Sequence, residues 1–314
     1  MDTPMGLHGS EYKTRLSSWD ARASVRRAPM RKFEIIEGTS IFSPDLVATM
    51  RHPLVKAASS DAHAKILTQK LYSYLYFTEK LERRTVMPAC IHLAEGTAPF
   101  DSPSALKRDA SKILVDEAHH AECAAELIAQ VAASTGEAPR LGYRPSFLTA
   151  LADAAARANR AGQPFVDLTF VAVSETLITG TLARVPLDPH VNPYVRDVVK
   201  DHAQDEARHY ACFSDVIHIM WSQLSTRERD AVGPLFAEFI EAFLAPDLAA
   251  EVRWLQAAGF DGATARSIVH ETFENMSRAQ LFREQARPTL TKLRSFGMLD
   301  HAPTLDALAE RDLL

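Results

Sequence analysis

Cysteine is scarce in this chain. Only three of its 314 residues are cysteines, Cys90, Cys123 and Cys212, and they are widely spaced. Such a set forms neither a disulfide framework nor the paired motif of a zinc knuckle. We therefore expect a protein of the reducing cytoplasm, in which the cysteines pack as small buried side chains.

Long apolar runs, glycine-rich hairpin signals and an excess of positive charge are missing as well. No segment of about 18 uncharged apolar residues is present, and residues 1–27 contain no apolar core of the signal-peptide type. The formal net charge of −5 gives no electrostatic reason to bind nucleic acid or an anionic membrane. We expect neither kind of partner.

Helical periodicity dominates the chain after about residue 52. The apolar spacing predicts four long helices, over residues 64–94, 102–134, 164–184 and 194–223. It also predicts shorter helices over 225–245, 247–258 and 261–283, and a last helix near the end of the chain. Residues 1–40 are polar and basic, so we expect a partly irregular N-terminal extension before a single helical domain over 41–314.

The motif Asp-Glu-x-x-His occurs twice, as "DEAHH" at 116–120 and as "DEARH" at 205–209. In each copy the glutamate and the histidine are three residues apart, so both project from one face of a helix. A Glu-x-x-His on each of two helices, with one glutamate from each of two others, is the ligand set of di-iron carboxylate bundles. The repeat predicts an all-α, ferritin-like bundle with a four-helix di-iron core and additional C-terminal helices.

The two remaining glutamates are expected on the first and third long helices. The third helix has only Asp167 and Glu175 as charged residues, and apolar residues surround Glu175 at helical spacing. A carboxylate buried there costs several kcal/mol unless a cation or a donor meets it, so Glu175 is predicted to face the metal. The first helix offers Glu79 and Glu82, and we choose Glu82 because its helical neighbours are more apolar.

A third histidine, His202, lies about 20° from His209 on the helical wheel, which predicts that both face the same metal. Four glutamates would balance two ferrous ions, with the histidines bound as neutral imidazoles. Mixed carboxylate and imidazole donors suit iron or manganese better than zinc. Asp116 and Asp205 are expected to accept hydrogen bonds from ligand histidines, with the pairing left open. The competing interpretation is a solvated polar stripe on each helix.

In their order, these residues resemble the di-iron N-oxygenases of the p-aminobenzoate N-oxygenase type. The pattern His-x3-Glu-x2-His at 202–209 carries the resemblance, which spans about residues 50–215. It implies that the chain is an enzyme that uses O2 to oxidise a primary amine of a small molecule to a hydroxylamine, nitroso or nitro product in secondary-metabolite biosynthesis. It also implies two iron ions and an external electron donor, a reductase or a ferredoxin.

The resemblance further implies the role of each ligand. Glu82 and His120 would bind one iron. Glu175, His202 and His209 would bind the other, and Glu117 and Glu206 would bridge the two. No catalytic residue beyond these ligands is expected. Three questions stay open: the identity of the amine (aryl or aliphatic), the formation of a homodimer, and two rival functions. The rivals are a C-hydroxylase or desaturase of the same bundle class and a non-catalytic ferritin-like iron-binding protein.

Overall fold

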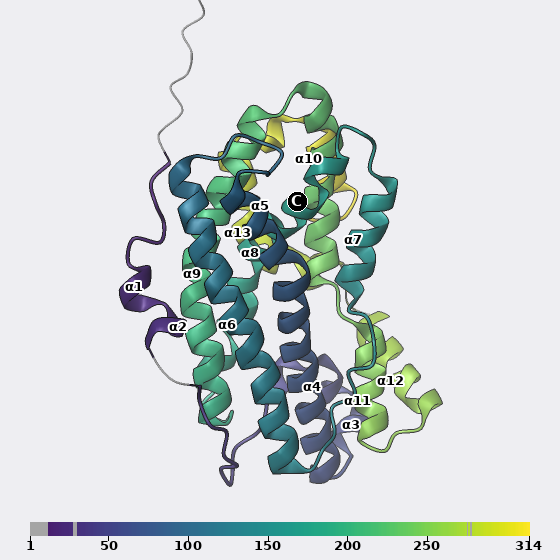
Figure 1. Cartoon of the computed structure of the whole chain (residues 1–314). Helices are drawn as coiled ribbons and strands as arrows, with labels where there is room; N and C mark the ends of the chain where they lie inside the picture. Colours follow the sequence, from purple (N-terminus) through teal and green to yellow (C-terminus); the bar gives the residue numbers. More distant parts are fainter. Residues whose placement is uncertain (1–11, 28–29, 275, 277) are drawn as a thin grey trace, which may run out of the picture.

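A computed structural model describes residues 12–27, 30–274, 276 and 278–314. Over these residues the chain is built from helices, and the only β pairing is one isolated parallel bridge between Ser40 and Val191. The prediction of an all-α helical bundle is confirmed (Figure 1). Across the described ranges, no helix is both long enough and apolar enough to cross a membrane.

The four predicted long helices form the centre of the molecule (Figure 1). The first is continuous in course but is made of α4, a π-helical turn and α5. α6 packs against α4 and α5, α8 packs against α9, and α6 also contacts α9. Their bounds are Ser60–Leu81 for α4, Glu82–Val86 for the π turn, Met87–Glu95 for α5, Ser104–Thr135 for α6, Val166–Leu182 for α8 and Pro193–Gln223 for α9.

Local sequence signals set the ends of these helices. The Ser59 hydroxyl caps α4 by accepting from the amide of Ala62, and the Asn192 side chain caps α9 by accepting from the amide of Tyr194. Gly96 and Gly136 end α5 and α6 with φ of 73° and 70°, a left-handed conformation that glycine adopts without strain. The two helices end at Glu95 and Thr135, within one residue of the predicted bounds at 94 and 134.

The remaining helices cover the ends of this core. α10, α13 and α7 pack on α8, whereas α11 packs on α4 and carries α12. Their bounds are Ser146–Arg157 for α7, Thr226–Leu244 for α10, Leu248–Ala257 for α11, Gly262–Glu274 for α12, Arg278–Ser295 for α13 and Ala302–Ala309 for α14.

Two sequence predictions about these helices are wrong. The helix predicted over 261–283 is two helices, α12 and α13, which pack on different parts of the core, on α11 and on α8. α7 was not predicted, although Phe147, Leu151 and Ala154 make a buried stripe with helical spacing.

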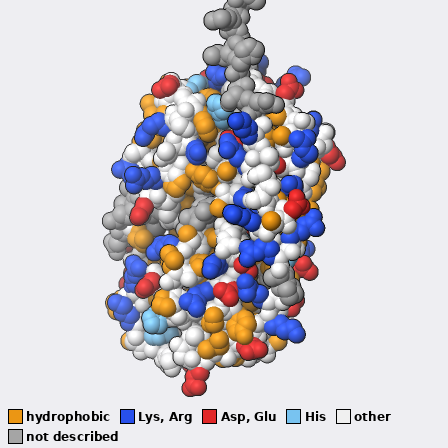
Figure 2. All heavy atoms as spheres, turned by 90° about the vertical axis from the view of Figure 1, so that its left-hand side faces the viewer, with side chains coloured by type: hydrophobic (Ala, Val, Ile, Leu, Met, Phe, Trp, Pro, Cys, Tyr) orange, Lys and Arg blue, Asp and Glu red, His pale blue; other side chains and the backbone are white. Residues whose placement is uncertain are grey.

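The N-terminal segment, defined as residues 12–27, lies along the outside of α6 and α9 (Figure 1). It contains two one-turn helices, α1 (Trp19–Arg22) and α2 (Ser24–Arg27). Leu16, Trp19 and Ala23 are buried against the bundle, while its arginines are exposed. Figure 2 shows this side of the molecule, with many lysine and arginine side chains at the surface. Residues 1–11 of the predicted extension lie outside the described part.

Candidate metal centre

The four long helices bring all seven predicted glutamates and histidines into one buried cluster. Each of the four glutamates is fully buried, as is His209, and His202 is 9% exposed. The competing interpretation of a solvated stripe is therefore wrong. The members are Glu82 at the π turn, Glu117 and His120 on α6, Glu175 on α8, and His202, Glu206 and His209 on α9.

Glu82 enters the cluster and Glu79 does not. Glu79 is partly buried on α4, outside the cluster, and its carboxylate pairs with Lys80 at 2.7 Å and with Arg83 at 3.3 Å. Glu82 begins the π turn, and such turns occur often at functional sites because the extra residue changes the direction of nearby side chains.

The cluster divides into two groups of four potential donors, each with its atoms within 4.8 Å of one another. Glu206 belongs to both groups. The first group is Glu82, His120, His202 and Glu206, and the second is Glu117, Glu175, Glu206 and His209.

His202 does not lie beside Glu175 and His209, the residues with which the resemblance groups it. His202 lies instead with His120, at 4.1 Å between the ring centroids, and its Nε2 is 3.8 Å from Glu82. The helical wheel compares only angles, whereas seven residues also advance about 10.5 Å along a helix. His202 and His209 therefore share a face of α9 but reach opposite ends of the cluster.

Glu117 and Glu206 lie between the two groups. Oε2 of Glu117 is 3.2 Å from Nδ1 of His120, and Oε1 of Glu117 is 2.9 Å from Nδ1 of His209. Glu206 Oε1 is 3.4 Å and 3.3 Å from the same two nitrogens. Carboxylates in this position could each bridge two metal ions.

Asp116 and Asp205 contact the far sides of two histidines in a crossed arrangement. His120 on α6 donates through Nε2 to Asp205 on α9 at 3.1 Å, and His209 on α9 donates through Nε2 to Asp116 on α6 at 3.1 Å. These bonds leave Nδ1 of each ring directed at the cluster, as in metal sites where a carboxylate fixes the orientation of a histidine ligand.

The buried polar atoms of the cluster fit metal ions. Within the described residues, both carboxylate oxygens of Glu82 and of Glu175 lack a hydrogen-bond partner. One oxygen of Glu206 lacks one too, as do Glu117 Oε1 and His209 Nδ1, because the 2.9 Å contact between these two atoms does not have hydrogen-bond geometry. Unpartnered buried donors and acceptors are costly and rare, and seven around one point match the needs of cations.

The electrostatics point the same way. Burial, and then repulsion by Glu117, raises the pKa of Glu82 well above its usual range. Burial, and then repulsion by Glu206, does the same to the pKa of Glu175. Burial and Glu206 also act to raise the pKa of Glu117, but contact with His209 and His120 outweighs them and lowers it to about 2. Cations would allow all four carboxylates to ionise together.

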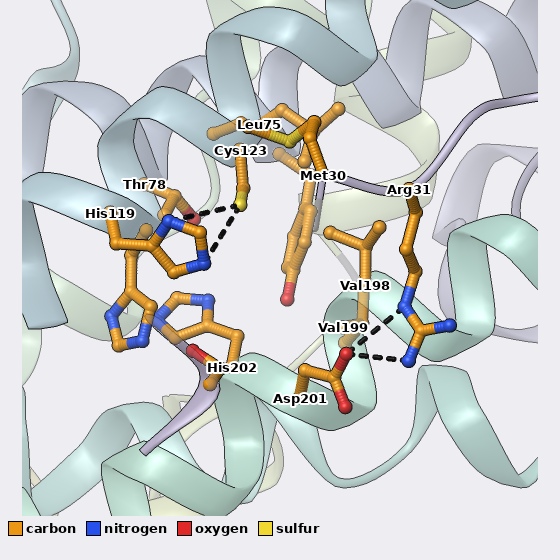
Figure 3. A pocket seen from close by; sticks show the side chains of 14 residues that line it. Met30, Arg31, Leu75, Thr78, His119, Cys123, Val198, Val199, Asp201 and His202 are labelled. Carbon is orange, nitrogen blue, oxygen red and sulfur yellow. Dashed lines mark hydrogen bonds and ion pairs between the residues drawn. The ribbon is translucent and has the colours of Figure 1, made fainter. Parts of the chain in front are cut away.

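A cleft of about 610 Å³, part of it open to solvent, reaches the first group of donors. His120 and His202 line this cleft, together with apolar side chains such as Leu75, Val198 and Val199. Figure 3 shows His202 with these apolar side chains around the cleft. At its mouth, the guanidinium of Arg31 donates to Asp201 at 2.6 Å. The cleft therefore connects the solvent with one end of the cluster.

Tyr74 and Thr78 line the same cleft, and sequence analysis missed both. The hydroxyl of Tyr74 is buried and has no hydrogen-bond partner among the described residues. A signal for both was present, because Tyr74 and Thr78 precede Glu82 by eight and four residues and so share its helical face.

Comparison with known proteins shows the family. The family model described as p-aminobenzoate N-oxygenase AurF matches residues 12–297. The chain belongs to the p-aminobenzoate N-oxygenase family. It is 24% identical over 271 residues to the 4-aminobenzoate N-oxygenase of Streptomyces thioluteus, an alignment that covers 82% of this chain and 78% of the relative.

Membership of the p-aminobenzoate N-oxygenase family identifies the chain as an enzyme that oxygenates amine nitrogen. The resemblance found in the sequence is confirmed, and neither the hydroxylase or desaturase nor the iron-binding alternative is favoured. The match begins at residue 12, so it includes the N-terminal segment as well as the four long helices.

Proposed function

We propose that this N-oxygenase holds two iron ions in the buried cluster and uses O2 to oxidise a primary amine of a small molecule to a hydroxylamine, nitroso or nitro product. The observation that supports it best is the set of unpartnered buried carboxylate oxygens in a cluster whose histidines His120 and His202 line a cleft. The proposal places the reaction in secondary metabolism.

Seven side chains of the cluster would hold the two ions. Glu82, His120 and His202 would bind the first. Glu175 and His209 would bind the second, with Glu117 and Glu206 between the two. The four negative charges would balance two ferrous ions, which suits a site without water around it. When bound, the metal pair would supply the reductive activation of O2, with electrons from an external reductase or ferredoxin.

The protein itself would bind and orient the amine. The cleft reaches His120 and His202, so the amine would approach the first group of donors while apolar side chains keep water out. Burial raises the pKa of Tyr74, so its hydroxyl stays neutral and can hydrogen-bond a polar group of the substrate.

The substrate of the named relative suggests an aromatic amine. The carboxylate of 4-aminobenzoate, however, would need a cation in the cleft, and Arg31 already pairs with Asp201 and Asp197. We therefore expect a neutral aromatic amine to bind better than 4-aminobenzoate. Formation of a homodimer and a cytoplasmic location stay predictions from the sequence.

Metal analysis and an amine panel would test this function. Protein made with ample iron should contain about two iron ions per chain. With a chemical reductant and O2, it should convert an aromatic amine to N-oxygenated products, detected by liquid chromatography and mass spectrometry. Comparing 4-aminobenzoate with 4-aminobenzamide tests the expected charge preference. Stoichiometric zinc, or products oxidised only at carbon, would contradict the proposal.

A further inference from the structure

The N-terminal segment is attached to the bundle through buried carboxylates. Its two helices have only four residues each, so its own secondary structure holds it weakly. Thr14 donates to Asp109 at 2.6 Å, while Trp19 and Ser24 donate to the two aspartates that contact the histidines of the cluster, Asp116 and Asp205. Two of these contacts lead directly to the metal centre.

Trp19 holds Asp116. Its indole Nε1 lies 2.9 Å from each carboxylate oxygen of Asp116, and Asp116 also accepts from Nε2 of His209 at 3.1 Å. Trp19 and Asp116 are both buried. Arg26 and Lys112 lie over the indole ring, at 4.5 Å and 5.6 Å from its centroid, and keep the ring in place.

Ser24 holds Asp205 in the corresponding way. The Ser24 hydroxyl donates to Asp205, and the Ser24 amide lies 3.2 Å from both oxygens of the same carboxylate. Asp205 accepts from Nε2 of His120 at 3.1 Å and also from the guanidinium of Arg208. One short segment therefore contacts both aspartates of the crossed arrangement.

We infer that Trp19 and Ser24 are positioning residues of the metal centre, acting on His209 through Asp116 and on His120 through Asp205. The inference rests on the proposed metal pair. A carboxylate that accepts from a histidine fixes the ring orientation and the tautomer, and losing such a partner typically lowers metal affinity by about 10–100-fold. Trp19 is the sharper test, because the amide of Ser24 and Arg208 would still hold Asp205 without the Ser24 hydroxyl.

The variant Trp19→Phe removes the indole N–H but keeps an aromatic ring beneath Arg26 and Lys112. Metal-free protein is titrated with Co²⁺, and bound metal is followed by ligand-field absorbance. We expect one of the two binding steps to weaken by about 10-fold, the lower end of the range for loss of a direct histidine partner, since Asp116 stays in place, with the other step unchanged. The absorbance bands of the weakened step should also shift, because Asp116, and through it the His209 ring, would be held less firmly.

The control is Thr14→Val. This variant loosens the same segment, but it does so at Asp109, which contacts Tyr12, Thr14 and Arg15 and no histidine of the cluster. Its Co²⁺ titration should match that of the wild type. Thermal unfolding of each metal-free variant separates a loss of stability from a loss of metal affinity.

A third variant, Asp116→Asn, keeps the inference testable if Trp19→Phe folds poorly. Asp116→Asn should weaken the same binding step. The double variant that combines it with Trp19→Phe should bind Co²⁺ little more weakly than either single variant, since both changes act through one carboxylate. Additive losses, equal weakening by Thr14→Val, or a wild-type titration of Trp19→Phe would overturn the inference. A wild-type protein that binds fewer than two Co²⁺ ions would instead overturn the proposed metal pair, and this inference with it.

Discussion

Replacing Glu175 by leucine should change the stability of the protein in opposite directions with and without metal. Glu175 is fully buried, with Val171, Ala172 and Ile178 buried on the same helix. Its two carboxylate oxygens lack hydrogen-bond partners among the described residues. Folding alone does not explain a carboxylate at this position, because an unsatisfied buried polar group costs about 1–3 kcal/mol.

The expected magnitude follows from that cost. Leucine has nearly the volume of glutamate, so Glu175→Leu should raise the free energy of unfolding of the metal-free protein by about 1–3 kcal/mol. That corresponds to roughly 1.5–4.5 °C in melting temperature for a chain of this length. For each bound ion the wild type should gain about 2.7 kcal/mol when free metal reaches 100 times the dissociation constant of that ion, and the variant should lose the gain from the ion at the second group.

The assay is thermal unfolding of both proteins, metal-free and with Co²⁺, together with metal analysis. Glu79→Leu is the matched control, since Glu79 pairs with Lys80 and Arg83 outside the cluster. It should leave the metal-dependent stabilisation unchanged. A Glu175→Leu protein that is less stable without metal and still binds two ions would refute the reasoning.

Three other variants or conditions test the site. Tyr74→Phe should raise KM for the amine several-fold with little change in metal content, as measured by steady-state kinetics and metal analysis, because its hydroxyl faces the cleft without a partner. His202→Ala should weaken binding of the first metal only, by about 10-fold or more, and abolish most N-oxygenation; equal loss of both ions would contradict the grouping. In urea unfolding between pH 5 and pH 8, the metal-free protein should lose stability as pH rises. The reason is that the pKa values of Glu82 and Glu175 are raised, so the folded state binds more protons than the unfolded state above about pH 4.3. Bound metal should remove that dependence, and a flat profile without metal would show that these acids are not held protonated.

The sequence was sufficient for the ligands on the regular helices. Glu175 could be chosen because a lone carboxylate among apolar neighbours needs a cation, and the two Asp-Glu-x-x-His motifs place their side chains by helical spacing alone. Glu82 was a closer choice, because the π turn at 82–86 has no signal in the pattern of apolar residues.

Features that depend on distances between helices could not be predicted. The angle between His202 and His209 on the helical wheel leaves out the rise along α9, which puts His202 beside His120 and not beside His209. The crossed bonds from His120 to Asp205 and from His209 to Asp116 depend on how α6 packs against α9. The contact of the Trp19 indole with Asp116 could not be predicted either, because one sequence does not show which carboxylate on α6 a distant tryptophan meets.

A single-turnover experiment with ¹⁸O2 tests the central claim most directly. The protein is loaded anaerobically with two equivalents of Fe²⁺ and is then mixed with an aromatic amine and ¹⁸O2. The product is analysed by mass spectrometry. The account predicts one or more ¹⁸O atoms bound to the amine nitrogen, with no product from Glu175→Leu. Oxygen on carbon, or an N-oxygenated product that carries only solvent oxygen, would contradict a metal-dependent amine N-oxygenase at this site.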